Sequence, residues 1–432
     1  MRILVTNAHT PQAYAIVRAL RPHPSRIVAT VEGDSLLAPL GHAARSRLVD
    51  ARYRVPSVVE EWSSGRLAGE PTAREMAYIF AIERICEDEQ IDVIFPSWDP
   101  YVVALSKHVE RFGGMGVTVP VPEFQVAITA LDKYRTVQAG MAVGFPCPRT
   151  YLYESLDQLA WISERESFPL VIKPRFTSGG RGMAIVRDRE ELLSEVPRVA
   201  SAYDSPMIQE YIPGGQRDSV QFVVGRSGQI VFCFQKRRIR TFRRTARFGT
   251  VSESVSPDER LRKTAPLVRQ SGWWGAMGIE TIRDPRDGQD KLMEINPRFP
   301  RQVWNRTELG INEPLMCIRI ARGEHVDPVE ACPLGVLFVS PVEDVGLLAL
   351  QLLDLGVYVC RTKIGRQAPL DALCAPLSVL EQLRSFARTY FSRQRKVWDP
   401  YLKHVFQDPL TSALWWLQFS TWLAGGYRQL GR

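Results

Sequence analysis

The first 120 residues alternate short apolar runs with helical patterns, and this alternation limits the fold more than any other feature of the chain. Apolar runs at 2–6, 27–31 and 91–95 read as strands, and the patterns at 11–20 and 72–88 read as helices. Strands separated by helices predict a Rossmann-like parallel α/β sheet. The turn after the first strand, Thr-Asn-Ala-His-Thr, lacks the G-x-G-x-x-G spacing that brings backbone close to a pyrophosphate, so dinucleotide binding is disfavoured there.

From about residue 150 the pattern changes to strands separated by glycine-rich turns, which predicts an α+β domain. Prolines near residues 120 and 146 bracket a helix and mark the change. We therefore expect an α/β domain at 1–120, an α+β domain at 121–327 and a divergent C-terminal region at 328–432. The strands expected beyond residue 150 lie at 170–173, 183–186, 207–211, 219–224, 230–235 and 335–341.

The composition is that of a globular protein, with 45% hydrophobic and 24% charged residues among 432. The longest apolar runs are shorter than the ~20 residues that cross a bilayer, so we expect a cytoplasmic protein. Seven scattered cysteines without a C-x-x-C pair predict neither a disulfide framework nor a zinc site. The net charge of +8 is concentrated at 236–247 and 384–432, which favours two local anion-facing surfaces over nucleic-acid binding.

A strand ending in Lys173 is followed by a loop of small residues, Thr-Ser-Gly-Gly-Arg-Gly, before the next strand begins. Glycine permits φ > 0 and leaves backbone N–H groups open to a ligand, so such a loop can close over phosphates while the lysine supplies charge. It is not a P-loop, because Gly-Lys-Ser/Thr is absent. A hairpin turn beside an exposed lysine is the alternative interpretation.

A second polar cluster lies in the run Glu-Ile-Asn-Pro-Arg at 294–298. In a strand, Glu294 and Asn296 point to one face because side chains alternate with period two. A hairpin through the turn Asp-Gly-Gln-Asp at 287–290 can bring Glu280 beside them. Carboxylate and amide oxygens without histidine or cysteine suit Mg²⁺, and Arg298 could meet a phosphoryl group. The alternative is a solvated polar face.

Six segments together resemble the motifs of the ATP-grasp superfamily, in the order in which the family carries them. They are Asp-Lys-Tyr-Arg-Thr at 132–136, Gly-Phe-Pro-Cys-Pro at 144–148, Val-Ile-Lys-Pro at 171–174, the glycine loop at 178–182, Gln-Glu-Tyr-Ile-Pro-Gly at 209–214 and Glu-Ile-Asn-Pro-Arg at 294–298. The resemblance covers roughly residues 1–325. It implies a pre-ATP-grasp α/β domain, similar to that of carbamoyl-phosphate-synthase-like members, followed by an α+β ATP-grasp fold.

The resemblance also implies ATP and Mg²⁺ as cofactors, with Mn²⁺ as the alternative ion. The nucleotide-binding residues that it implies are Lys133 and Lys173 for the α- and β-phosphates, Ser178, Gly179, Gly180 and Gly182 for the closing loop, Glu210 for the adenine amino group, the backbone of Ile212 for the ring edge and Asp218 for the ribose. The implied metal ligands are Glu280, Glu294 and Asn296, and the implied catalytic residues are Arg298 and Lys173. Asp218 lies one position later than the family spacing places the ribose carboxylate.

The activity that the resemblance implies is an ATP-dependent ligase that joins a small-molecule carboxylate to an amine through an acyl phosphate, with release of ADP. A bicarbonate-using carboxylase, a carbamoyl-phosphate-like enzyme and a catalytically silent ATP sensor are the alternatives. The identities of the acid and the amine stay open. The basic loop at 236–247 either binds a phosphate or carboxylate, since arginine matches both, or is a solvated loop.

Residues 379–432 combine arginines and lysines with a tryptophan-rich apolar run. This pattern suits the headgroup interface of an anionic membrane, and the protein would then be peripheral at the inner face of that membrane. The alternative is that the tryptophans pack on the protein itself or on a homodimer partner.

Overall fold

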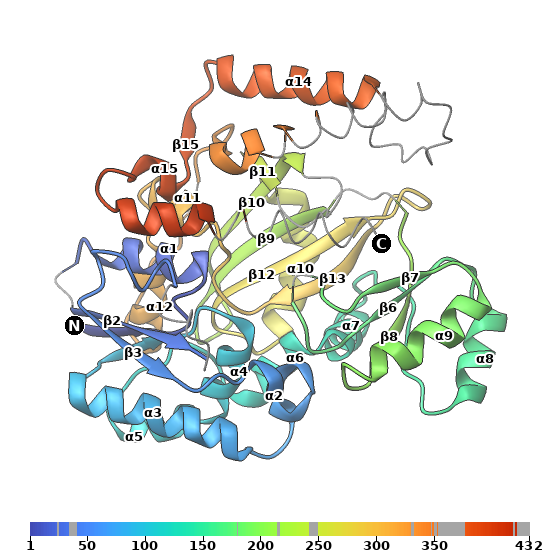
Figure 1. The fold of residues 1–432 in the computed structure, drawn as a ribbon, viewed down its shortest axis with the longest axis horizontal. Helices are drawn as coiled ribbons and strands as arrows, with labels where there is room; N and C mark the ends of the chain where they lie inside the picture. Colours follow the sequence, from blue (N-terminus) through green and yellow to red (C-terminus); the bar gives the residue numbers. More distant parts are fainter. Residues whose placement is uncertain are drawn as a thin grey trace. The chain divides into compact units, whose positions relative to one another are not determined.

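In the computed structural model the chain begins with a four-stranded parallel sheet, as the alternation of strands and helices predicted (Figure 1). The strands lie in the order β3-β2-β1-β4. They are β1 (Arg2–Val5), β2 (Arg26–Glu32), β3 (Ala51–Val55) and β4 (Val93–Phe95). The chain runs outward from β1 to β3 and returns to the other side of β1 at β4. The carboxyl ends of β1 and β4 are therefore the switch point at which ligands bind in such sheets.

Helices surround this sheet and lead to the next domain. They are α1 (Pro11–Leu20), α2 (Val59–Ser63), η2 (Arg66–Ala68), α3 (Ala73–Glu89), α4 (Asp99–Lys107), α5 (Val109–Gly114), α6 (Phe124–Leu131) and α7 (Lys133–Ala142). Asp132 lies between α6 and α7 and caps α7 by accepting from the backbone N–H of Tyr134. The carboxylate of Asp132 also accepts hydrogen bonds from Nε and Nη2 of Arg175, and these bonds fix the start of α7.

A small antiparallel sheet follows, in the order β5-β8-β6-β7. Its elements are β5 (Thr150–Tyr151), α8 (Leu156–Arg165), β6 (Leu170–Lys173), β7 (Ala184–Val186), α9 (Arg189–Ala200) and β8 (Met207–Glu210). One face packs against α8 and α9 through Leu170, Ile172 and Ile208, which are completely buried. Because side chains alternate along a strand, Lys173 and Gln209 lie on the other face of this sheet.

A larger antiparallel sheet carries the second half of the predicted α+β domain. Its strands in this part of the chain are β9 (Arg217–Val224), β10 (Ile230–Thr241), β12 (Gly275–Arg283) and β13 (Asp290–Asn296), in the order β13-β12-β9-β10. One face packs against α6, α7 and α10 (Asp258–Gln270) through residues such as Phe222, Ile279 and Leu292. Helices α11 (Trp304–Thr307) and α12 (Glu313–Ala321) complete this region.

The structure describes residues 1–23, 26–33, 41–178, 180–213, 217–241, 249–329, 332–346, 348–349, 352, 376–417 and 420. They form two compact units, one of residues 1–235 with 257–330 and one of residues 236–256 with 331–432. The second unit contains β11 (Gly249–Val255), β14 (Leu337–Val339), α14 (Pro376–Phe391), β15 (Lys396–Trp398) and α15 (Pro400–Lys403). Among the described helices none is long and apolar enough to cross a membrane.

The predicted domain boundaries stay a prediction, and the two compact units group the residues in another way. Residues 1–120 and 121–327 fall in one unit because α4 packs against α6 and their core continues into the large sheet. Residues 236–256 join the C-terminal region because β11 pairs with β14. The ion pair of Arg240 and Asp344 lies in the second unit, where Thr250 also donates to the aspartate.

The fully buried ion pair of Arg306 and Glu313 gives a test of the core packing in the first unit. Both side chains are almost completely inaccessible to solvent, and the Arg306 guanidinium also contacts the Phe234 ring. We expect Glu313→Ala to lower the free energy of unfolding by about 3–5 kcal/mol, because it leaves an unpaired charge in the core. The exposed pair of Arg319 and Glu324 gives the control, since Glu324→Ala should change it by less than about 1 kcal/mol. Equal effects in urea unfolding would contradict the assignment.

Candidate active site

Two lysines from different elements face the same region. Lys173 ends β6, and its Nζ donates to Oε1 of Gln209 at 2.5 Å. Lys133 begins α7, and its Nζ donates to the backbone carbonyls of Arg175 and Thr177. Burial lowers the pKa of both lysines, and that of Lys173 falls to about 8, although the nearby Glu294 carboxylate favours the charged form. The charge of Lys133 also contributes to the lowered pKa of Lys173, so the two ammonium groups feel each other.

The glycine loop between β6 and β7 lies against the N-terminal domain. Ser178 Oγ accepts from the Trp98 indole N–H at 3.1 Å, and the Arg181 guanidinium lies 5.3 Å from the centre of the Trp98 ring. Gly182 has φ = 71°, and a Cβ there would overlap the ring of Tyr203, so glycine is required. Gly180 also has a positive φ, whereas Gly179 lies outside the described residues.

The carboxylates of the second cluster meet as the hairpin predicted. Glu280 of β12 and Glu294 of β13 are direct partners across the two strands. Asn296 lies on the same face, with its Nδ2 3.4 Å from Glu280 Oε1 and 3.3 Å from Glu294 Oε1. In the described part of the chain no three His, Cys, Asp or Glu side chains converge on a metal-sized site. A divalent ion at the two glutamates would therefore take its other ligands from the amide oxygen, water or phosphate, which suits Mg²⁺.

Arg298 joins this cluster to the N-terminal sheet. Its Nε donates to Asp99 Oδ1 at 2.5 Å, and its Nη2 donates to Asn296 Oδ1 at 3.1 Å. Burial opposes the charge of Arg298, but the carboxylates of Asp99, Glu294 and Glu280 outweigh it and raise the pKa of the guanidinium. Asp99 begins α4, one short loop after the carboxyl end of β4 and at the switch point of the sheet. Its position after a predicted strand was the signal that sequence reasoning missed.

These groups surround a cavity of about 30 Å³, which is large enough for a water molecule or an ion. Its lining residues come from both the N-terminal domain and the α+β domain. They are Trp62, Asp99, Ala130, Leu131, Lys133, Thr177, Ser178, Glu294, Ile295, Asn296 and Arg298. The cavity thus brings predicted phosphate-binding, metal-binding and catalytic residues together with Asp99.

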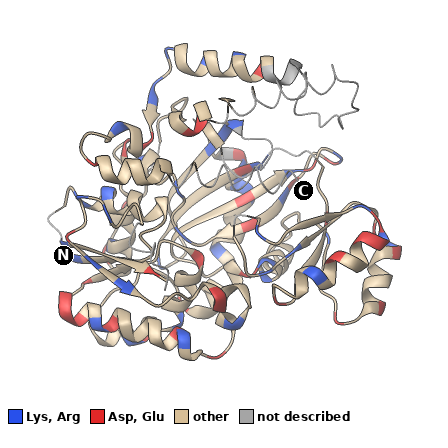
Figure 2. Cartoon of the chain, in the orientation of Figure 1, with Lys and Arg blue, Asp and Glu red and all other residues tan. Residues whose placement is uncertain are grey.

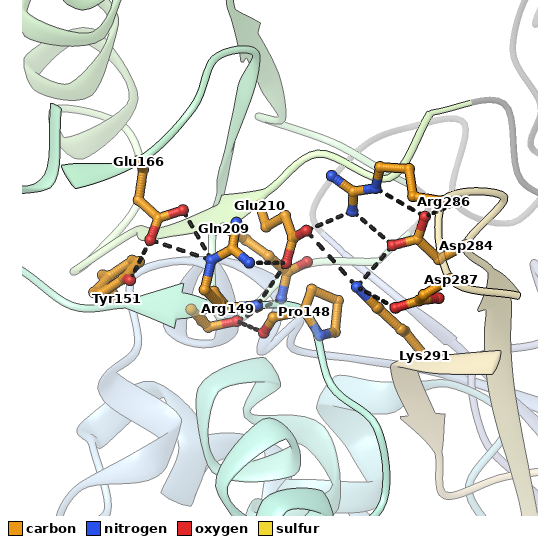
Figure 3. A network of polar contacts seen from close by, with 11 residues as sticks. Pro148, Arg149, Tyr151, Glu166, Gln209, Glu210, Asp284, Arg286, Asp287 and Lys291 are labelled. Carbon is orange, nitrogen blue, oxygen red and sulfur yellow. Dashed lines mark hydrogen bonds and ion pairs between the residues drawn. The ribbon is translucent and has the colours of Figure 1, made fainter. Parts of the chain in front are cut away.

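Glu210 lies elsewhere than its predicted role requires. Its carboxylate accepts from Arg286 and from the backbone N–H of Arg149, and it lies 3.7 Å from Lys291 Nζ (Figure 3). Figure 3 shows that Arg286 and Lys291 also hold Asp284, whose pKa they depress strongly. Because side chains alternate along a strand, Glu210 points to the face of the sheet opposite Lys173, whereas the preceding Gln209 points to the same face as Lys173. A contact of Glu210 with adenine would therefore use its backbone.

Asp218 also differs from its predicted role. It is buried on the face of β9 that carries Val220 and Phe222, and its carboxylate pairs with Arg260 of α10. Ser219, one residue later, is the cross-strand partner of Glu280 and shares its face. Strand alternation thus turns the Asp218 carboxylate into the core, and its assignment to a ribose stays a prediction. Residues 214–216, which precede it, lie outside the described residues.

Residues 130–301 match the ATP-grasp domain family. This part of the chain is an ATP-grasp domain. The carbamoyl phosphate synthase large chain of Vibrio cholerae is 24% identical over 291 residues, which cover 60% of this chain and 26% of that protein. Human mitochondrial pyruvate carboxylase is 23% identical over 252 residues, which cover 54% of this chain and 21% of that protein. The chain therefore spans about a quarter of the length of these relatives.

Solved biotin carboxylases share the fold of the ATP-grasp domain and of the preceding sheet. The Campylobacter jejuni enzyme, in a β-γ-ATP complex, has a TM-score of 0.60 at 17% identity, covering 78% of this chain and 74% of that one. The biotin carboxylase domain dimer of Hydrogenobacter thermophilus 2-oxoglutarate carboxylase, with MgADP, ADP and bicarbonate, has a TM-score of 0.58 at 18% identity, covering 75% and 70%. The predicted fold is confirmed: a parallel N-terminal sheet followed by an ATP-grasp α+β region.

The lowered pKa of Lys173 predicts that nucleotide binding depends on pH. Burial disfavours the ammonium form, so Lys173 is charged below about pH 8 and loses its proton as the pH rises above that value. We expect the Kd for Mg-ADP to rise above pH 8, by at most about tenfold per pH unit. The measurement is isothermal titration calorimetry between pH 7 and 9.5.

Lys173→Arg is the matched control, because a guanidinium stays charged throughout this pH range. Its affinity is free to differ from that of the wild type, but the dependence on pH should flatten. A wild-type Kd that stays constant over this range would contradict the role of Lys173 as a titrating phosphate ligand.

Proposed function

We propose that this chain uses MgATP to phosphorylate a carboxylate, forming an acyl phosphate and ADP. The observation that carries the proposal is the convergence of Lys133, Arg298 and Glu294 on one cavity, with Lys173 close by. Phosphoryl transfer needs little covalent chemistry from a protein and depends on positioning and on neutralising charge. The site offers cations for phosphates and carboxylates for a metal ion.

In this proposal Lys133 and Lys173 bind the α- and β-phosphates, and the loop at 178–182 closes over them. The contacts of Ser178 and Arg181 with Trp98 support a closed position of the loop. A closed loop would exclude water, which otherwise hydrolyses an acyl phosphate. Arg298 would stabilise the charge on the transferred phosphoryl group, with Asp99 holding the orientation of the guanidinium.

Glu280, Glu294 and Asn296 would hold Mg²⁺, whose charge neutralises phosphate oxygens when it is bound. Mn²⁺ has similar ligand preferences and is the alternative ion. For the adenine we propose the backbone of Glu210 and Ile212, since the Glu210 carboxylate is already paired. Gln209 would act on the nucleotide indirectly, by fixing the Lys173 ammonium.

The similarity to carboxylases and to carbamoyl phosphate synthase favours bicarbonate as the acid. Carbamoyl phosphate synthase and pyruvate carboxylase are among the similar proteins, and a similar solved carboxylase domain contains bicarbonate. An organic acid joined to an amine, as the sequence suggested, is the second candidate, because the same site chemistry activates either acid. The basic loop at 236–247, which was expected to bind such an acid, gives this second candidate little support. Its Arg237 and Arg240 pair with Glu253 and Asp344, and residues 242–248 lie outside the described residues.

The test is ADP release from MgATP with bicarbonate or with a panel of organic acids, each with and without hydroxylamine. Release that requires bicarbonate supports the carboxylase chemistry. Release with one organic acid, together with a trapped hydroxamate, supports the ligase. Lys173→Ala should lower either rate by about 10²–10³-fold, because it removes one charge that stabilises the transition state. Nucleotide binding without ADP from any acid would contradict the proposal and favour a sensor.

The metal assignment predicts that Glu294→Gln shifts the dependence on Mg²⁺. A neutral amide is a weaker ligand for a hard cation than a carboxylate, so we expect the Mg²⁺ concentration for half-maximal ADP release to rise by about tenfold or more. Glu259→Gln, on the surface of α10, is the control and should leave the titration unchanged. Superimposable titrations of the wild type and Glu294→Gln would show that the acid is structural.

A further inference from the structure

The segment from 380 to 417 exposes an unusual number of large apolar side chains. Phe391 is 85% exposed and Phe406 is 94% exposed. The other exposed members of this set are Leu380, Leu383, Leu402, Leu410 and Leu417. Single exposed apolar residues are ordinary on a protein surface, but so many within one stretch of the sequence are a candidate for a binding surface. We call these seven residues, grouped by their place in the sequence, the apolar cluster.

Helix α14 carries apolar side chains on a packed face and on an exposed face. On the packed face, Tyr390 lies against the core of Val251, Leu337 and Val339, and Thr389 is buried. At 100° per residue, Leu380 and Phe391 lie on the opposite face and Leu383 lies at its edge, and all three are exposed. The fold of the second unit therefore uses one face of α14 and leaves the other for a different contact.

Exposed charge around the apolar cluster is almost entirely positive. Five exposed basic residues belong to the same segment: Arg384, Arg388, Arg393, Arg395 and Lys403. The exposed acid among these described residues is Glu381, since Asp399 and Asp408 are buried. Figure 2 colours these basic and acidic residues on the chain. Exposed apolar side chains interspersed with basic ones fit the headgroup region of an anionic bilayer.

The tryptophans of this region have a different role from the cluster. Trp415 is buried, with its ring stacked 4.9 Å from that of Tyr401. Trp398 packs with Val251, Leu337 and Val339 in the core of the second unit. Trp398 and Trp415 thus belong to the fold, as the packing alternative predicted, whereas Trp422 lies outside the described residues. Leucines and phenylalanines form the exposed surface.

We propose that residues 380–417 dock on an anionic lipid bilayer, with the apolar cluster in the headgroup region and the arginines against lipid phosphates. A two-fold contact between copies of this chain would bring the positive surfaces together, which like-charge repulsion disfavours. The segment belongs to the second compact unit, whereas every proposed nucleotide and metal ligand lies in the first. Membrane docking is therefore independent of the proposed function and can fail without affecting it.

The test is co-sedimentation of the full chain with vesicles of phosphatidylcholine alone or mixed with phosphatidylglycerol. We expect binding to the anionic vesicles, weakened by salt because the Debye length falls from ~10 Å at 0.1 M to ~3 Å at 1 M. Phe391→Ser combined with Phe406→Ser should reduce the partition coefficient by about tenfold or more, and Arg384→Gln combined with Arg388→Gln should do the same. Absence of binding, or equal binding to both vesicle types, would overturn the proposal.

Matched controls come from exposed residues of the first unit. Leu156→Ser combined with Trp161→Ser removes two apolar side chains that are 68% and 50% exposed, and Arg84→Gln combined with Arg187→Gln removes two exposed charges. Both controls should bind vesicles as the wild type does. If the phenylalanine variant melts at a lower temperature or loses a dimer in sedimentation velocity, the cluster is covered by this chain or by a second copy, and the proposal is overturned.

Discussion

The ion pair of Asp99 and Arg298 is the contact on which the arrangement of the site depends. It joins residues 199 positions apart, one at the switch point of the parallel sheet and one just beyond β13. Arg298 in turn donates to Asn296, so the pair also sets the orientation of that amide beside Glu280 and Glu294. A displacement of the N-terminal sheet would therefore reach the proposed metal ligands directly. The ion pair adds to the packing of α4 against α6, which holds residues 1–120 and the ATP-grasp domain in one compact unit.

Charge balance adds a second constraint on the site. Lys133, Lys173 and Arg298 carry three positive charges, and the carboxylates of Asp99, Glu280 and Glu294 carry three negative charges when all six are ionised. Burial lowers the pKa of both lysines in spite of the nearby Glu294, whereas the carboxylates outweigh burial at Arg298 and raise its pKa. Partners of opposite sign are what make such burial tolerable. A bound Mg-nucleotide would bring both signs together and preserve much of the balance.

The sequence predicted those features of the site that depend on local geometry. The strand period placed Glu294 and Asn296 on one face, and the hairpin turn brought Glu280 opposite Glu294. The helix at 11–20 has the predicted bounds because Thr10 caps it and Pro11 begins it. The partners that cross long stretches of chain were not predictable in this way. Asp99 meets Arg298, and Arg286 meets Glu210, only after separate sheets have packed.

Glu210 and Asp218 show that a motif can identify the correct strand and still leave open which side chain on it faces the site. In both cases the neighbouring residue lies on the side of the site: Gln209 bonds to Lys173, and Arg217 is close enough for its charge to lower the pKa of that lysine. A shift of one position along a strand moves a side chain to the opposite face of the sheet. The same shift changes the spacing between two motifs by only one residue, so the motif is still recognised. The region around Lys173 therefore carries an amide and a guanidinium where two carboxylates were expected. The Arg217 guanidinium strengthens the positive potential around Lys173, which favours the phosphates of a nucleotide as the ligand of this face.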